Sequence, residues 1–238
     1  MNESHPTALI TGASGGIGEA LARELAKSKH DLGLVARSEG KLRALADELS
    51  TAHGITADVL TADLAAPGAG VALADRLAGR RIDVLVNNAG FGDYGPFADA
   101  DPAKVSAMVN LNIATLTDLT RALLPDMIAR GTGRVMNVAS TAAFMPGPLM
   151  AEYYASKAYV LSLSEAVANE LRGTGVTMTA LGPGPVASGF QADAGLGGQK
   201  RGKGKDVSAA HRGGGGGGRG GGGGGAGGGG EGRKRDGS

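Results

Sequence analysis

The chain has no cysteine and no tryptophan, and its other aromatic residues are limited to four tyrosines and four phenylalanines in 238 positions. The absence of cysteine excludes disulfides, thiol catalysis and metal sites with cysteine ligands, and it is compatible with a reducing compartment. With so few aromatic side chains, a hydrophobic core must be built from Ala, Leu, Val, Ile and Met. No apolar run approaches the roughly 20 residues that span a membrane, so we expect no membrane partner.

Targeting and metal-binding signals are also missing. The N-terminal residues MNESHP are polar and lack the basic start and apolar stretch of a signal peptide, which favours a cytoplasmic protein. The histidines share no spacing typical of metal ligands, so we expect no metal site. They are His5, His30, His53 and His211.

The composition divides the chain into two parts. Residues 195–238 contain about half of the 44 glycines and carry nine basic and three acidic residues, a net charge of +6. Residues 1–194 carry fifteen basic and twenty acidic residues, a net charge of −5. We expect 1–194 to form one folded domain. We expect 195–238 to be a disordered basic tail, because glycine loses much conformational entropy on ordering and offers no apolar surface.

Short apolar runs alternate with longer segments of helical periodicity. The predicted strands cover residues 7–11, 31–36, 56–62, 82–86, 134–139 and 176–181. The predicted helices cover residues 17–27, 41–49, 71–78, 102–128 and 151–171, and Pro125 could interrupt the fourth. This alternation predicts an α/β Rossmann fold with a doubly wound parallel sheet, whose ligands bind at the carboxyl ends of the strands.

A glycine-rich turn, TGASGGIG over residues 11–18, joins the first predicted strand to the first helix. Gly12 permits a tight turn, Gly16 lets the backbone approach a pyrophosphate, and Gly18 lets the helix pack closely on the sheet. The N-terminus of the helix offers free N–H groups to phosphates. The turn therefore predicts a dinucleotide-binding site.

The second predicted strand ends with Ala36 and Arg37, where a cofactor with a free ribose 2′-hydroxyl usually meets an acidic residue. Arginine can instead bind a 2′-phosphate, so we expect NADP(H) to be favoured over NAD(H). The alternative for Arg37 is a salt bridge with a surface carboxylate. Asp63, after the third strand, could bind the adenine amino group or serve as a helix cap or turn residue.

Tyr153 and Lys157 lie four residues apart in a predicted helix, so both face one side of it. A cation beside a phenol favours the phenolate and lowers the pKa of the phenol, which makes tyrosine a general acid and base. Ser140 follows the fifth predicted strand, and its hydroxyl can reach the tyrosine and a substrate oxygen. Alone, the tyrosine–lysine spacing also fits a surface pair on an ordinary helix.

In their order along the chain, these motifs resemble the short-chain dehydrogenase/reductase family, from residue 7 to about 190. The family's TGxxxGxG, NNAG and PGxVxT motifs match residues 11–18, 87–90 and 183–188, with Ser188 in place of threonine. The resemblance implies four catalytic residues, Asn112, Ser140, Tyr153 and Lys157, with Asn110 as the alternative to Asn112. The cofactor-binding residues that we predict are Thr11, Gly12, Ser14, Gly16, Ile17, Gly18, Arg37, Asp63, Asn88, Ala89, Gly90, Tyr153, Lys157, Pro183, Gly184 and Val186.

The resemblance also implies a reaction. A hydride passes between the nicotinamide and a carbonyl or secondary alcohol, Ser140 and Tyr153 hold the substrate oxygen, and Tyr153 exchanges the proton. Lys157 binds the ribose and lowers the tyrosine pKa, while Asn112 holds a water that links Lys157 to solvent. The apolar residues of 144–150, with Phe91, Tyr94 and Phe97, suit an apolar ketone or 3-oxoacyl substrate, although ordinary loop packing explains them equally well.

The chain departs from the family pattern after the sixth strand. We see no sequence for the family's substrate-covering helix or its seventh strand, so a homo-oligomer, which is typical of the family, is in doubt here. The tail is either a segment that binds RNA or another polyanion, or the product of a shifted reading frame in a GC-rich gene. The alternatives to an active enzyme are therefore a cofactor-binding but impaired family member, and a dinucleotide domain with a polyanion-binding tail.

Overall fold

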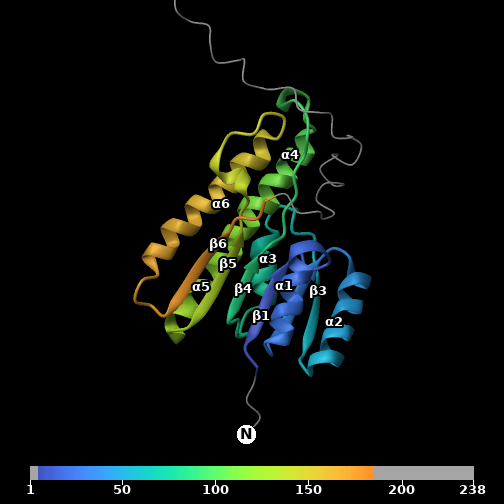
Figure 1. Ribbon diagram of the computed structural model, residues 1–238, viewed down its shortest axis with the longest axis vertical. Helices are drawn as coiled ribbons and strands as arrows, with labels where there is room; N and C mark the ends of the chain where they lie inside the picture. Colours follow the sequence, from blue (N-terminus) through green and yellow to red (C-terminus); the bar gives the residue numbers. More distant parts are fainter. Residues whose placement is uncertain (1–4, 185–238) are drawn as a thin grey trace, which may run out of the picture. The chain divides into compact units, whose positions relative to one another are not determined.

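The computed structural model describes residues 5–184, whose strands form one parallel sheet of six (Figure 1). The strands are β1 (Thr7–Thr11), β2 (Asp31–Ala36), β3 (Ala57–Thr61), β4 (Val84–Asn87), β5 (Gly133–Val138) and β6 (Val176–Leu181). The α-helices are α1 (Gly16–Lys27), α2 (Glu39–His53), α3 (Ala69–Arg76), α4 (Pro102–Val109), α5 (Leu116–Arg130) and α6 (Ala151–Glu170). Three shorter helices are η1 (Phe97–Asp99), η2 (Asn110–Thr115) and η3 (Thr141–Phe144).

The strands lie in the order β3-β2-β1-β4-β5-β6. The chain therefore winds outward in one direction from β1 to β3, then returns to pair β4 with the other side of β1. The direction of winding changes between β1 and β4, and open parallel sheets bind their ligands at the carboxyl ends of the strands beside such a point. The predicted doubly wound Rossmann fold is confirmed.

Helices cover both faces of the sheet because strand residues alternate between two cores. Ala8 and Ile10 of β1 pack in a cluster with α1 and α2, whereas Leu9 belongs to a second cluster with α3 and α5. All three side chains are fully buried. Both faces of β1 are therefore apolar, as expected of a central parallel strand.

The predicted elements agree with the observed ones, except at one helix. Residues 102–128 were expected to form a single helix that Pro125 could interrupt, but Pro125 lies inside the continuous helix α5. The interruption is η2, a π-helical turn between α4 and α5. This wider turn matters for the site because it carries Asn112.

The described helices include none with the length and hydropathy that a membrane span requires. The predicted cofactor residue Val186, the substituted Ser188 and the tail 195–238 lie outside the described residues.

Candidate active site

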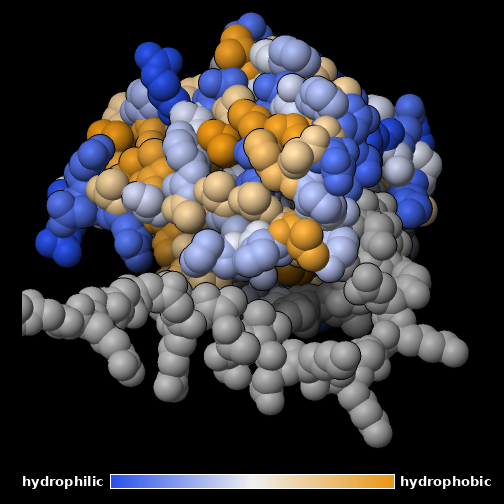
Figure 2. Space-filling model, turned by 90° about the horizontal axis from the view of Figure 1, so that it is seen from above, coloured by the Kyte–Doolittle hydropathy of each residue, from blue (hydrophilic) through white to orange (hydrophobic). Residues whose placement is uncertain are grey.

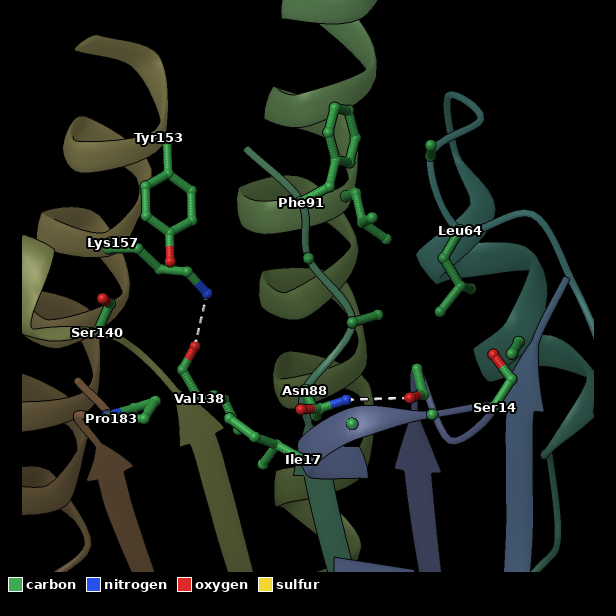
Figure 3. Close-up of a pocket in the computed structure, with 18 of the residues that line it drawn as sticks. Ser14, Ile17, Leu64, Asn88, Phe91, Val138, Ser140, Tyr153, Lys157 and Pro183 are labelled. Atoms are coloured by element: carbon green, nitrogen blue, oxygen red, sulfur yellow. Dashed lines mark hydrogen bonds between the residues drawn. The ribbon is translucent and has the colours of Figure 1, made fainter. Parts of the chain in front are cut away.

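A cavity of about 560 Å³ lies at the carboxyl ends of the strands and collects residues that are far apart in the sequence (Figure 3). Fourteen of the predicted site residues line it, namely Gly12, Ser14, Gly16, Ile17, Arg37, Asp63, Asn88, Ala89, Gly90, Ser140, Tyr153, Lys157, Pro183 and Gly184. Thr11, Gly18 and Asn112 lie behind this lining. Each of these three contacts residues that do line the cavity.

The glycine-rich turn has the tight geometry that its sequence predicts. Gly12 and Gly16 have φ angles of 67° and 57°, in the left-handed region that favours glycine. A Cβ atom at Gly18 would clash with the Gly12 carbonyl and with the side chain of Asn88. Helix α1 follows without a side-chain cap at Gly15, so its first N–H groups are open to an anionic group in the cavity.

Thr11 fastens this turn to the segment that follows β4. Its hydroxyl accepts hydrogen bonds from the backbone nitrogens of Asn88 and Ala89, both at 3.0 Å, and donates to the Val86 carbonyl at 3.3 Å. The Asn88 side chain also joins the two segments, because its Nδ2 donates to the Thr11 and Gly12 carbonyls at 2.9 and 3.2 Å. The two chain segments that flank the β1–β4 junction are thus held as one unit.

Tyr153 and Lys157 reach into the cavity from α6, and Ser140 reaches in from the end of β5 (Figure 3). The Lys157 ammonium lies 5.8 Å from the centre of the Tyr153 ring. Its side chain is only 6% exposed, and its Nζ donates to the Val138 carbonyl at 2.7 Å. Burial lowers the pKa of Lys157 to about 8.

The pKa of Tyr153 is raised above its ordinary value. Burial of the phenol is the largest cause, and it outweighs a hydrogen bond with the Ser140 side chain that acts in the opposite direction. Our prediction that the nearby Lys157 lowers the pKa of Tyr153 is therefore wrong. A phenol with a raised pKa is protonated at neutral pH and can act as a proton donor.

Asn112, rather than Asn110, projects into the interior from the π-helical turn and is 2% exposed. Its Nδ2 donates to the Phe91 carbonyl at 2.9 Å and to the Ser156 hydroxyl at 3.0 Å, and its Oδ1 accepts from the Phe91 nitrogen at 3.2 Å. Both amide hydrogens are used by protein atoms. A water bound by this side chain would have to use the remaining capacity of Oδ1.

Arg37 is exposed at the end of the cavity formed by β2 and forms no ion pair within residues 5–184. Lys41, which was not among the predicted site residues, lines the cavity from the first turn of α2. No local signal in the sequence identifies it, because Arg37 precedes the N-cap Ser38 and the four-residue spacing of a helix does not apply to this pair. Asp63 lines the cavity too, and its carboxylate accepts from the Ala65 nitrogen at 3.1 Å, as in a turn.

Comparisons with known proteins agree with this geometry. The sequence pattern of the family described as short chain dehydrogenase matches residues 6–196. The chain belongs to the short-chain dehydrogenase family. The resemblance that the motifs suggested is thus confirmed.

Among its relatives, the ketoacyl reductase HetN of Nostoc sp. is 39% identical over 186 residues, which cover 76% of this chain and 63% of that protein. The very-long-chain 3-oxoacyl-CoA reductase of Anas platyrhynchos is 36% identical over 189 residues, covering 76% and 60% of the two chains. A short-chain dehydrogenase from Sphingobium yanoikuyae, solved in complex with NADPH, superposes with a TM-score of 0.77 at 38% identity, covering 80% and 75%. The chain spans 60–63% of the length of these two curated relatives.

The side of this short-chain dehydrogenase cavity away from the glycine turn is apolar. Phe91, Met150 and Tyr154 line it, and a neighbouring hollow of about 460 Å³ shares Met150. Some large apolar side chains that line this hollow are exposed, among them Phe97 at 62% and Leu149 at 41%. Figure 2 looks onto this end of the molecule and shows apolar residues beside hydrophilic ones. Tyr154 lines the cavity and also packs against Gly147.

Proposed function

We propose that this short-chain dehydrogenase is an NADP(H)-dependent oxidoreductase that acts on a carbonyl or secondary alcohol, with Tyr153 as general acid and base. One observation carries the proposal. The hydroxyls of Ser140 and Tyr153 and the buried ammonium of Lys157 share a cavity with a glycine turn and an open helix N-terminus. Acid–base groups and a phosphate-binding turn are the two parts that such a reaction requires.

The residues present fit a bound dinucleotide. The close contacts at Gly12 and Gly18 leave no room for a Cβ atom, so the turn packs directly against Asn88. Gly12, Gly15 and Gly16 of the same turn line the cavity. The first N–H groups of α1 suit a pyrophosphate, and Asn88, Ala89 and Gly90 lie along the same wall. When bound there, the nicotinamide supplies or accepts the hydride.

The side chains account for the proton transfer. Ser140 and Tyr153 can both donate hydrogen bonds to a carbonyl oxygen, on which negative charge develops during reduction. The pKa of Tyr153 lies above the ordinary value for a phenol, so Tyr153 is protonated at neutral pH and can give its hydroxyl proton to the substrate oxygen. Lys157 supplies a fixed cation close to the phenol and has N–H groups beyond the one bonded to Val138 with which to bind ribose hydroxyls.

We infer an apolar ketone or a 3-oxoacyl compound as the substrate. The apolar wall formed by Phe91, Met150 and Tyr154 supports this class, as do the names of two relatives, a ketoacyl reductase and a 3-oxoacyl-CoA reductase. Arg37 supports NADP(H) over NAD(H), because its guanidinium is exposed at the cavity, forms no ion pair within residues 5–184 and can bind a 2′-phosphate.

The test combines a fluorescence titration with NADPH and a screen of carbonyl substrates, using Tyr153→Phe and the neighbouring Tyr154→Phe as a control. We expect Tyr153→Phe to keep the NADPH dissociation constant and to lower kcat by about 10²–10⁴-fold, the usual contribution of general acid–base catalysis. Tyr154→Phe should keep most of the activity. If Tyr153→Phe retains more than about a tenth of wild-type turnover, Tyr153 is not the proton donor.

The same experiment separates the alternatives. NADPH binding without turnover of any carbonyl would identify an impaired, cofactor-binding family member. The net charge of +6 over residues 195–238 favours one other candidate, a polyanion-binding role of the tail. Salt-sensitive RNA binding that is lost when 195–238 are removed would support that role.

A further inference from the structure

Ser156 lies on α6 between Tyr153 and Lys157 but does not line the cavity. Its side chain is completely buried. Its hydroxyl donates to the backbone carbonyl of Tyr153 at 2.7 Å and accepts from the Nδ2 of Asn112 at 3.0 Å. A hydroxyl has only one hydrogen to donate, so the donor and acceptor roles of Ser156 are both defined by these two contacts.

The contacts of Ser156 continue through Asn112 to the segment after β4. The second Nδ2 hydrogen of Asn112 goes to the Phe91 carbonyl, and the Phe91 nitrogen donates to Oδ1, which also fixes the orientation of the amide. A continuous chain of hydrogen bonds therefore runs from the backbone of Phe91 to the backbone of Tyr153. Its two side chains, those of Asn112 and Ser156, are buried from water, so the loss of the bond between them would leave a buried polar group without a partner.

This series of hydrogen bonds joins the two halves of the candidate active site. Phe91 follows Asn88, Ala89 and Gly90, which line the cavity on the cofactor side, whereas Tyr153 belongs to the helix that carries the proton donor. The spacing between the halves is tight. A Cβ atom at Gly90 would lie 3.1 Å from Asn112 Oδ1 and 3.5 Å from Lys157 Nζ. A small shift of α6 would therefore move the phenol relative to the cofactor-binding segment.

We propose that Ser156 is a positioning residue, whose hydroxyl fixes α6, and with it Tyr153, against Asn112 and the segment that binds the cofactor. This role rests on the proposed oxidoreductase function. It does not require Ser156 to touch substrate or cofactor. Asn112 acts here through its side-chain bonds to Phe91 and Ser156.

The same helix provides a matched control. Ser164 is 2% exposed, donates to the Val160 carbonyl at 2.6 Å and accepts from the Nδ2 of Asn137 at 2.9 Å. It therefore repeats the bonding of Ser156, but on an asparagine of β5 that does not line the cavity. Ser164→Ala removes a buried hydroxyl of the same kind away from the cavity. It therefore shows how much the loss of such a hydroxyl affects the protein when no site residue is involved.

The first test measures hydrogen exchange at residues 88–94 in the full-length protein without added dinucleotide. We expect Ser156→Ala to speed exchange of the Phe91 amide about tenfold, because Asn112 loses a partner, while Ser164→Ala leaves it within about twofold of wild type. Ser156→Thr, which keeps the hydroxyl, should restore slow exchange. Equal acceleration in Ser156→Ala and Ser164→Ala would overturn the proposal. Ser156→Cys, close in size, is used if the alanine variant does not fold.

The second test measures steady-state kinetics with NADPH and the best ketone of the substrate screen. We expect Ser156→Ala to lower kcat about tenfold at a nearly unchanged NADPH dissociation constant, Ser156→Thr to recover most of it, and Ser164→Ala to stay within about twofold. Combining Ser156→Ala with Asn112→Ala should cost no more than Asn112→Ala alone. An unchanged kcat in Ser156→Ala refutes the positioning role. Absence of turnover in the wild type refutes the proposed function instead, and the exchange test still decides the role of Ser156.

Discussion

Lys157 combines a buried side chain with the absence of any ion pair within the described residues. Burial lowers its pKa from 10.5 to about 8. Between these values the unfolded chain binds more protons than the folded protein, so the contribution of Lys157 to the free energy of unfolding rises with pH. Below pH about 8 the buried charge costs stability, and that cost is consistent with a residue kept for its chemistry.

We therefore predict that Lys157→Met is more stable than the wild type at pH 7, on the order of 1–3 kcal/mol after allowing for the lost bond to Val138. The difference should shrink as pH rises from about 8 toward 10, which urea denaturation at several pH values would show. Lys104→Met is the control, because Lys104 is exposed and paired with Asp93. A destabilised Lys157→Met at pH 7, or a difference that does not vary with pH, would contradict the prediction.

At the level of single residues, spacing alone placed Tyr153, Lys157 and Ser140 in one site. A helix brings residues four apart to one face, and strand ends of a parallel sheet meet at one edge. The direction of the Tyr153 pKa shift could not be predicted in this way, because burial depends on side chains distant in the sequence. Ser156 and Lys41 were missed for the same reason, since their importance lies in what the fold places beside them.

Asp83, just before β4, holds the starts of the central elements together. Its carboxylate accepts from the Thr7 nitrogen at 3.0 Å and from Arg81 at 2.8 Å, and Arg130 lies 3.9 Å away. Burial by itself would raise the pKa of Asp83, but the Thr7 amide and the two guanidinium groups outweigh it and lower the pKa. At pH values above the pKa that Asp83 has in the unfolded chain, such a carboxylate stabilises the folded state. This stabilisation is lost as the pH falls through the lower pKa of the folded protein.

Asp83→Ala should accordingly lower the free energy of unfolding at pH 7 by about 1–3 kcal/mol, because the Thr7 amide at the start of β1 loses its partner. The difference in the free energy of unfolding between the variant and the wild type should become smaller below pH about 4, because the wild-type carboxylate becomes protonated. Thermal or urea unfolding over a pH series would show both effects. Asp47→Ala, on the exposed face of α2, should change stability by less than about 0.5 kcal/mol at any pH. A similar loss in the two variants would argue against the role of Asp83.

Among the elements, strands and most helices were predictable because apolar periodicity is a local signal. The π-helical turn η2 was not, and the only local helix breaker, Pro125, pointed to the wrong place. The bonds that accompany this turn run to other parts of the chain. Asn112 reaches Phe91 and Ser156, and the Thr115 hydroxyl donates to the Leu64 carbonyl at 2.9 Å. A window of sequence contains none of these partners.

For the whole molecule, the alternation of strands and helices was enough to predict the sheet and the edge at which ligands bind. Residues from the ends of all six strands do meet in one cavity. The predictions for Val186, Ser188 and residues 195–238 remain predictions, because these positions lie outside 5–184. Ligand binding to the folded protein offers a test of the cavity as a unit, since any ligand that prefers the folded state stabilises it.

NADPH should raise the melting temperature of the full-length protein. A ligand at 100 times its dissociation constant adds about 2.7 kcal/mol, which for a domain of this size corresponds to roughly 5–10 °C. NADH at the same concentration should give a clearly smaller shift, because only NADPH carries the 2′-phosphate that Arg37 can bind. Arg37 lines the cavity and forms no ion pair within residues 5–184, so its guanidinium is available for a phosphate. Arg43 does not line the cavity and pairs with Glu39 at 2.6 Å.

Arg37→Ala should therefore reduce the NADPH shift to that of NADH and leave the NADH shift unchanged, whereas Arg43→Ala should preserve the difference between the two cofactors. Thermal denaturation followed by circular dichroism, over a concentration series of each dinucleotide, measures all of these shifts. Equal shifts with NADPH and NADH in the wild type would remove the proposed cofactor preference. If the preference exists but survives Arg37→Ala, the 2′-phosphate must be held by another cation, and Lys41 in the first turn of α2 is the one that also lines the cavity.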